Sequence, residues 1–300
     1  MGTSFPTGKK ILLGREIAYM ISQAGGNQAQ AAAFIETSPA RMAGLIKGQG
    51  TISVGDLERL ANKLGFTDKD YIEVLQDLRR DNHRRGFWTT GYRRAYAEDV
   101  RLLVTLEELA EELRSVDIEV MPGLVQCESY IRAIHEHPDG DKHDPHCVTT
   151  DDSVQARLAR QEVLKRENGP MFSAVLSESA LRRVYGSREV MLEQLEYLME
   201  VAKRPNIQIQ VMPFEITPPR MSMAYHYVLL TVPSPGAAGP LHMAYVESEG
   251  SDIRYLDDKK AFAARDAGWR RLTATALNPT DSVKFMEEVA RSFRRKTFKH

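Results

Sequence analysis

The chain has 300 residues, which is enough for two domains that each bury a hydrophobic core. Its hydrophobic content of 42% and charged content of 27% are ordinary for a soluble protein, and two cysteines are too few for a disulfide scaffold. A net charge of −1 excludes a chain that is basic throughout, so any nucleic-acid-binding surface must be local. No apolar run reaches membrane-spanning length and no signal-peptide core is present, so we expect a cytoplasmic protein that does not enter the membrane.

Residues 26–48 predict two short helices joined by a tight turn. Asn27 suits the N-cap of the first helix, and Ser38 followed by Pro39 suits the start of the second. Apolar residues at helical spacing follow in the second helix: Met42, Leu45 and Ile46. Gly48 would end that helix in a left-handed turn. This pattern is typical of a helix-turn-helix unit, and an ordinary helical hairpin within a core is the alternative.

Further helices are predicted on both sides of this pair. Upstream, one helical face is apolar: Leu12, Leu13, Ile17, Met20 and Ile21. Downstream, Ser53–Asp56 has the sequence pattern of a capping box, and Thr67–Asp70 has the same pattern before another apolar helical face. The resulting set of five helices resembles the lambda-repressor-like DNA-binding domain of the xenobiotic-response-element (XRE) class. The residues that carry the resemblance are Gln28, Ser38, Lys47–Gly48 and Asp56–Ala61. It implies a DNA-binding domain over residues 8–80.

In that class the N-terminal end of the third helix enters the major groove. The exposed positions would be Pro39, Ala40, Arg41 and Gly44. Of these only Arg41 can make a bidentate contact to guanine, whereas Pro39 and Ala40 can at most touch thymine methyl groups. Gln28, Ser38 and Lys47 would lie near phosphates. A solvated surface arginine is the alternative for Arg41.

Residues 81–96 predict a basic, aromatic linker between domains. Its four arginines, Arg84, Arg85, Arg93 and Arg94, together with Arg79 and Arg80 just before it, surround Phe87, Trp88 and Tyr92. We expect the aromatic side chains to pack structurally, and the arginines either to lie along phosphates or to be solvated.

Residues 97–296 predict a mixed α/β domain, because helical and strand patterns interleave there. Strands are expected at 116–121, 171–176, 207–211, 225–232, 242–246 and 253–256. Helices are expected at 98–112, after Gln126, at 151–166, after Ser177 and Ser187, at 259–277 and at 280–294. The fold class is therefore multidomain, an all-α helix-turn-helix domain followed by a mixed α/β domain. Met121–Tyr130 and Pro233–Pro240 are expected to be exposed segments available to a partner.

Five short motifs in this region resemble the effector-like domain of the two-domain actinobacterial WhiJ-like regulators, which also carry an XRE-class reader in front. They are Met121–Gln126, Ala156–Gln161, Glu193–Leu195, Asn206–Phe214 and Tyr245–Glu247. The usual family pattern has a threonine after the Leu-Val-Gln run, where this chain has Cys127. The resemblance implies no biochemical role for individual residues of this domain.

The sequence gives little indication of metal binding or catalysis. The segment His135–Cys147 holds four histidines and a cysteine, the side chains that zinc prefers, but its spacing matches no established zinc module, so we expect no metal or other cofactor. Ser177–Ser179 lacks a glycine elbow, and no phosphate-binding or dinucleotide-binding glycine motif is present. Acids such as Glu178 and Glu193 read as solvated. We therefore expect no enzyme and no catalytic residues.

These observations favour a sequence-specific transcriptional regulator. Because its reader is poor in base-reading side chains, we expect a homodimer on an inverted-repeat operator in double-stranded DNA. The C-terminal domain would bind a small partner protein or a small-molecule ligand to control DNA binding. The alternative is an antitoxin-like protein that chiefly sequesters a small partner and autoregulates its operon.

Overall fold

The computed structural model describes residues 6–80, 95–136, 148–218, 223, 225–248 and 252–295. The chain forms two compact units. Unit 1 comprises the N-terminal helices together with residues 101–109 and 232–241, and unit 2 holds most of the remaining chain. Most of the predicted linker, 81–96, and most of the segment 135–147 lie outside the described residues.

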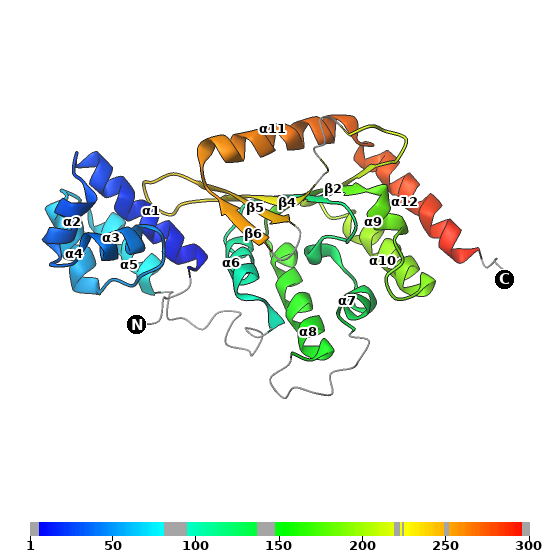
Figure 1. Ribbon diagram of the computed structural model, residues 1–300, viewed down its shortest axis with the longest axis horizontal. Coiled ribbons are helices and arrows are strands. Elements are labelled where there is room, and N and C mark those ends of the chain that lie inside the picture. Colours follow the sequence, from blue (N-terminus) through cyan, green and yellow to red (C-terminus); the bar gives the residue numbers. More distant parts are fainter. Residues whose placement is uncertain are drawn as a thin grey trace. The chain divides into compact units, whose positions relative to one another are not determined.

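Unit 1 is helical at its N-terminal end, as predicted (Figure 1). Its five successive helices are α1 (Gly8–Gln23), α2 (Gln28–Phe34), α3 (Pro39–Ile46), α4 (Val54–Lys63) and α5 (Lys69–Arg80). Their apolar faces meet in one core, where the largest fully buried side chains are Ile17, Met20, Met42, Leu57, Leu60 and Leu75. Burial of these faces stabilises helices that are too short to persist alone.

The helix caps of unit 1 largely follow the predictions. Asn27 and Gln30 form a reciprocal capping box, and the Ser38 hydroxyl accepts a hydrogen bond from the backbone N–H of Arg41. Ser53 accepts from the backbone N–H of Asp56. The prediction for Thr67 was wrong, since the Asp68 carboxylate accepts from the Tyr71 backbone N–H at 2.8 Å and α5 begins at Lys69. Asp68 stands one residue before the helix, which is the N-cap position.

Two segments from later in the chain complete unit 1. One is the C-terminal part of α6 (Glu98–Glu107), where the Thr105 hydroxyl accepts a hydrogen bond from the Gly8 backbone N–H at 3.1 Å. The other is the loop Pro233–Pro240, which joins two strands of the sheet. The helical domain is therefore built from three separate parts of the sequence.

Unit 2 is a mixed α/β domain around a six-stranded sheet of order β3-β2-β1-β4-β5-β6. The strands are β1 (Glu112–Asp117), β2 (Met171–Ser177), β3 (Ile207–Met212), β4 (His226–Val232), β5 (Leu241–Ser248) and β6 (Asp252–Leu256). β1, β2 and β3 pair in parallel, whereas β4 pairs antiparallel with β1 and β6 pairs antiparallel with β5. Parallel neighbours require crossover connections, and the intervening helices supply them.

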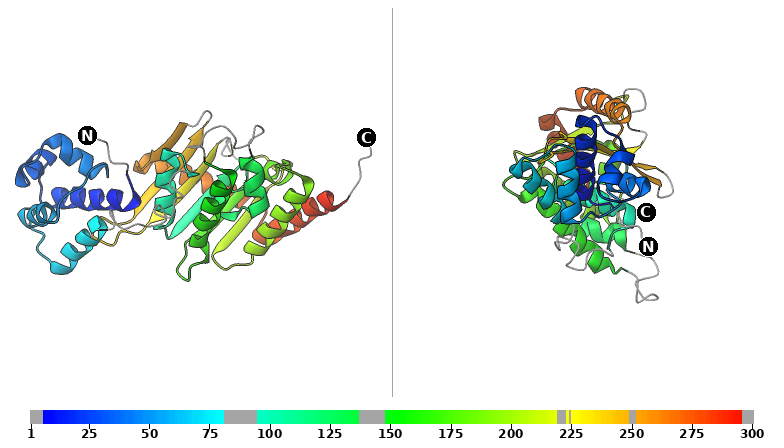
Figure 2. Two further views of the ribbon diagram at one scale, coloured as in Figure 1. Left: turned by 90° about the horizontal axis from the view of Figure 1, so that it is seen from below. Right: turned by 90° about the vertical axis from the view of Figure 1, so that its left-hand side faces the viewer.

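Helices cover both faces of this sheet. They are α7 (Glu128–His135), α8 (Thr150–Gln161), α9 (Glu178–Arg182), α10 (Arg188–Val201), α11 (Lys259–Thr275) and α12 (Pro279–Arg294), with short 3-10 turns η3 (Gly123–Val125) and η4 (Glu162–Lys165). α11 lies on one face, and α7, α8 and α10 lie on the other (Figure 1). These three helices stand in front of the sheet in the left view of Figure 2. α12 packs against α10 and β3.

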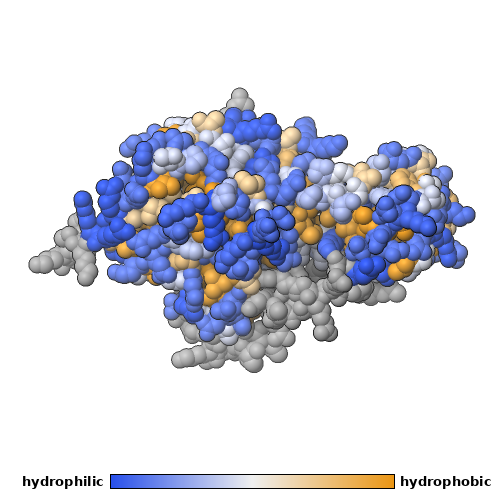
Figure 3. Space-filling model, turned by 180° about the vertical axis from the view of Figure 1, so that it is seen from behind, coloured by the Kyte–Doolittle hydropathy of each residue, from blue (hydrophilic) through white to orange (hydrophobic). Residues whose placement is uncertain are grey.

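The face of the sheet under α11 carries a hydrophobic cluster. Its buried members are Val116, Val175, Met212, Tyr227, Leu229, Ala244, Trp269 and Leu272. On the molecular face drawn in Figure 3, hydrophobic side chains form separate patches among hydrophilic ones. Separate patches of this kind are ordinary on a folded protein.

The structure corrects several expectations for unit 2. The first strand covers Glu112–Asp117 rather than 116–121, and Glu178, expected to be solvated, is 7% exposed and accepts the Phe214 backbone N–H at 2.8 Å. The alternation of apolar and polar residues in Ile207–Met212 is typical of a half-buried strand, but five of its six positions are buried. Gln210 can be buried because its side-chain amide donates to the carbonyls of Thr273 and Leu277.

Met121–Tyr130, expected to be exposed, is mostly buried. Three buried glutamines hold this segment. Gln126 donates to the Met121 carbonyl, Gln161 donates to the carbonyls of Gly123 and Gln126, and Gln194 bonds the Val125 carbonyl and the Cys127 N–H. The segment is a structural element, because its backbone groups are satisfied inside the protein.

Candidate nucleic-acid interface

The predicted DNA-contacting residues lie on α3, at its two ends, and at the start of α2. Gln28, Ser38, Pro39, Ala40, Arg41 and Lys47 are exposed, and Gly44 is half-buried. A Cβ added to Gly44 would meet no atom within 4 Å, so the space next to it is open. The opposite face of α3 is buried through Met42 and Leu45. The helix therefore presents one free face that carries the predicted residues.

The N-terminal end of α3 brings Ser38 and Arg41 together. The Ser38 hydroxyl accepts the Arg41 backbone N–H at 3.2 Å, and Pro39 occupies the first turn, where no amide hydrogen is needed. This start fixes the direction in which Arg41 leaves the helix, and Gly44 follows one turn later on the same face. Gln28 stands apart at the first position of α2, a helix that packs against α3.

The turn between α2 and α3 contains a residue in the left-handed region. Glu36 has φ 52°, and the backbone N–H of Thr37 reaches back to the Ala32 carbonyl at 3.0 Å. This hydrogen bond closes the end of α2 in the way that usually takes a glycine. The turn is therefore tight but strained at Glu36.

The other end of α3 rests on α1 through two glycines. A Cβ added to Gly14 would lie 2.3 Å from the carbonyl oxygen of Ile46 and 2.7 Å from that of Leu45. Gly48, with φ 71°, lies against Ile11, to which an added Cβ would come within 3.0 Å. α1 and α3 thus touch backbone to backbone, and the position of α3 depends on α1.

The charges around α3 are mixed. Residues 8–80 contain ten lysines and arginines against eight acids, so the placement of a few cations matters more than their number. Arg41 and Lys47 are exposed on α3 and its C-terminal end. Arg59 of α4 is half-exposed and lies 3.5 Å from the carboxylate of Glu36, which is part of the turn between α2 and α3.

Neither Gly14 nor Glu36 was predicted to shape this site. An isolated glycine inside a helical pattern is a signal of close packing, and Gly14 carries that signal. Nothing in the sequence marks Glu36 as a left-handed residue, since glycine or asparagine is the usual choice there.

No alternative chemical centre emerges from the described residues. Among them, no three His, Cys, Asp or Glu side chains cluster closely enough to hold a metal ion. His226 contacts Asp117 at 3.1 Å and the Val116 carbonyl at 3.0 Å. Asp117 in turn accepts a hydrogen bond from Ser115. Here the carboxylate, and not the imidazole, bonds the serine, so the histidine is not placed to remove the serine's proton. None of the described helices is long and apolar enough to cross a membrane.

Comparisons with known proteins bear on the second half of the chain. Residues 100–288 match the family model described as a domain of unknown function, DUF5753. Searches of curated proteins and of solved structures find no match. The matched segment includes unit 2 and also the two later segments of unit 1, residues 101–109 and 232–241. With well over half of its length matched, the chain belongs to the DUF5753 family.

Proposed function

We propose that the protein is a sequence-specific DNA-binding transcriptional regulator, in which α2 and α3 form a helix-turn-helix unit of the XRE class. The observation that carries this proposal is the free face of α3. It is a short, doubly capped helix whose buried side is fixed by Met42 and Leu45 and whose other side exposes Arg41 beside an open Gly44. A helix of this kind fits a major groove, and Arg41 can pair with a guanine.

The remaining contacts would fix the protein on the DNA backbone. Ser38 and Gln28 stand at helix N-termini, where backbone amides favour phosphate, and Lys47 stands at the far end of α3. One strong base contact per reader gives little discrimination, so two readers on an inverted repeat would supply the specificity. The family domain would then bind a partner protein or a small ligand and so control DNA binding.

Selection of DNA by the full chain tests this function. A pool of random-sequence duplexes is passed over the purified protein, and the bound duplexes are amplified and sequenced. The affinity of the protein for the enriched duplex is then measured by fluorescence anisotropy. We expect an enriched inverted repeat with a guanine in each half-site. Arg41→Ala should weaken binding to it by about 1–3 kcal/mol per contact and relax the preference for that guanine.

Arg295→Ala is the matched control, because it removes an arginine at the end of α12 and should leave the affinity unchanged. The proposal fails if no sequence is enriched, or if Arg41→Ala binds the enriched duplex as tightly and selectively as the unaltered chain. Co-purification of a small protein in the absence of any enriched sequence would favour the antitoxin-like alternative.

A further inference from the structure

A loop of the family domain encloses a buried carboxylate of α1. Glu16 is 0% exposed. Its oxygens accept hydrogen bonds from the Ser234 hydroxyl at 2.5 Å and from the backbone N–H groups of Ala237 and Ala238 at 2.9 and 3.1 Å. The Tyr71 hydroxyl of α5 donates to the same carboxylate at 2.7 Å. A buried carboxylate with this many donors is held in one position.

The neighbouring arginine holds the other polar groups of the same loop. A terminal nitrogen of Arg15 donates to the carbonyl of Pro240 at 3.0 Å and lies 3.4 Å from those of Ala238 and Gly239. Consecutive residues of opposite charge on α1 therefore bind the amides and the carbonyls of Pro233–Pro240. This corrects the expectation that the loop is free for a partner, although several of its side chains remain exposed.

The loop is shaped to fit this carboxylate. A Cβ added to Gly236 would lie 2.5 Å from the carboxylate carbon of Glu16, so only glycine lets the chain come so close. Gly239 has φ 72°, a conformation that favours glycine at the point where the loop turns back. The fit depends on particular residues in both the helix and the loop.

The same turn of α1 supports α3. Gly14 precedes Arg15 and Glu16 in sequence and lies against the carbonyls of Leu45 and Ile46 at the end of α3. The loop thus contacts α1 through the side chains of Arg15 and Glu16, and α1 contacts α3 backbone to backbone at Gly14. A shift of the loop that moves Glu16 must act on a helix that touches α3 directly.

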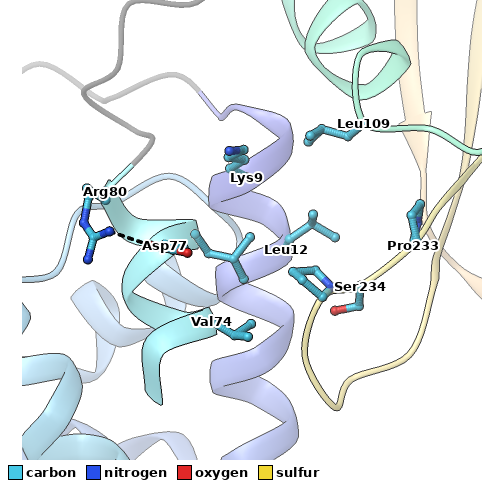
Figure 4. A pocket seen from close by; sticks show the side chains of 10 residues that line it. Lys9, Leu12, Val74, Asp77, Arg80, Leu109, Pro233 and Ser234 are labelled. Atoms are coloured by element: carbon cyan, nitrogen blue, oxygen red, sulfur yellow. Dashed lines mark hydrogen bonds and ion pairs between the residues drawn. The ribbon is translucent and has the colours of Figure 1, made fainter. Parts of the chain in front are cut away.

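The loop also has room to move. A cavity of about 540 Å³ lies beside Pro233, Ser234 and Pro235, and its other walls come from α1, α5 and Leu109 (Figure 4). Ser234 lines this cavity and also bonds Glu16. Among the described residues, this side of the loop therefore borders open space rather than packed side chains.

We propose that the loop Pro233–Pro240 positions α3 through Arg15 and Glu16, and that the family domain controls DNA affinity along this route. The inference rests on the proposed DNA-binding function. The loop is continuous with β4 and β5, so a partner or ligand that alters these strands alters the loop. Release of Glu16 would loosen α1 and let α3 move, and typical couplings of this kind change affinity by about 5- to 150-fold.

Two substitutions in the full chain release the loop by different means. Gly236→Ala places a methyl group against the Glu16 carboxylate, and Ser234→Asp places a second negative charge beside it. Gly55→Ala is the matched control, because a Cβ there meets nothing within 4 Å. Hydrogen exchange of the backbone amides of α3 is measured without DNA, and affinity for the selected duplex is measured separately.

We expect both variants to exchange the amides of α3 about tenfold faster and to bind the selected duplex about tenfold more weakly, whereas Gly55→Ala changes neither. Unchanged exchange in α3 in both variants would overturn the inference. Because exchange is read without DNA, failure to select any duplex would overturn the proposed function and leave the exchange result interpretable.

Discussion

Gly14 of α1 faces the carbonyl oxygen of Ile46 so closely that an added Cβ would lie 2.3 Å from it. This contact is with backbone atoms, which cannot turn aside as the end of a side chain can. Two helices that are separated in the sequence by α2 are therefore held at a spacing that only glycine permits.

Gly14→Ala should accordingly destabilise unit 1, even though alanine favours a helix. Overpacking of this kind costs about 1–3 kcal/mol, against a gain in helix propensity of about 1 kcal/mol for replacing glycine. We expect a lower urea midpoint for the loss of helical signal. Gly55→Ala, which has open space in α4, should leave the midpoint unchanged or raise it.

Glu36→Gly should stabilise the turn between α2 and α3. Glu36 has φ 52°, where a side chain costs about 1–2 kcal/mol and glycine costs none, although part of this gain is lost to the greater freedom of glycine in the unfolded chain. The ion pair with Arg59 is exposed and adds little. Glu36→Ala removes the same ion pair but keeps the strain, so only the glycine variant should melt higher.

Gln194→Leu should destabilise unit 2 strongly. Gln194 is 0% exposed and satisfies both the Val125 carbonyl at 2.9 Å and the Cys127 N–H at 2.7 Å. Leucine of similar size would leave two buried backbone groups unpaired, at about 1–3 kcal/mol each. Gln208→Leu is the control, because that side chain is exposed on β3. Equal melting temperatures for the two variants would contradict this account of Met121–Tyr130.

Tyr227 and Tyr130 should respond differently to loss of the hydroxyl. Among the described residues the buried Tyr227 hydroxyl has no hydrogen-bond partner, whereas that of Tyr130 accepts the Met121 backbone N–H at 3.2 Å. Tyr227→Phe should therefore be neutral or stabilising, and Tyr130→Phe should cost about 1 kcal/mol. Chemical unfolding of the two variants under one set of conditions makes the comparison.

The buried side chain of Tyr227 should also make the stability of the folded protein sensitive to alkaline pH. Burial raises the pKa of Tyr227 to about 12. The folded state therefore keeps a proton that the unfolded chain loses near pH 10, so stability is intact below about pH 10 and falls as the pH rises toward 12. Since each pKa unit corresponds to 1.36 kcal/mol, Tyr227→Phe should recover about 2–3 kcal/mol of this loss at pH 12. An unfolding curve at pH 12 that matches the unaltered chain would contradict the assignment.

Homodimer formation remains a prediction, and it is based on the small number of base-reading side chains on α3. A reader with a single bidentate donor, Arg41, needs a second copy for specific binding. Light scattering should give twice the chain mass of 33.8 kDa, at least on the selected duplex. A mass that corresponds to one chain per duplex would contradict both the homodimer and the inverted-repeat operator.

Local signals predicted much of the fold. Asn27, Ser38 and Ser187 each precede a helix that begins where the cap places it, because a side-chain oxygen satisfies an amide of the first turn. Apolar periodicity located most strands. The first strand was misplaced because Leu113 and Val116 are not separated by an even number of positions, and Ser115 and Asp117 are buried polar residues on the same strand.

Long-range contacts could not be predicted from the sequence. Glu16 looks like a solvated acid on the outer face of a helix, and its partner Ser234 lies 218 positions later. Likewise Gln126, Gln161 and Gln194 come from three separate segments, and nothing in any one of them shows that the other two satisfy its backbone. The caps and the buried side of α3 were predictable, because the residues that form them lie within a stretch of 23 residues, 26–48.

Hydrogen exchange of the full chain with and without the selected duplex tests directly whether α3 reads the DNA. We expect protection of residues 38–47, centred on α3, together with weaker protection at the start of α2. The loop Pro233–Pro240 should change its exchange on DNA binding as well, since it is coupled to α3. Protection confined to unit 2, with residues 38–47 unchanged, would contradict the central claim that α3 reads the DNA.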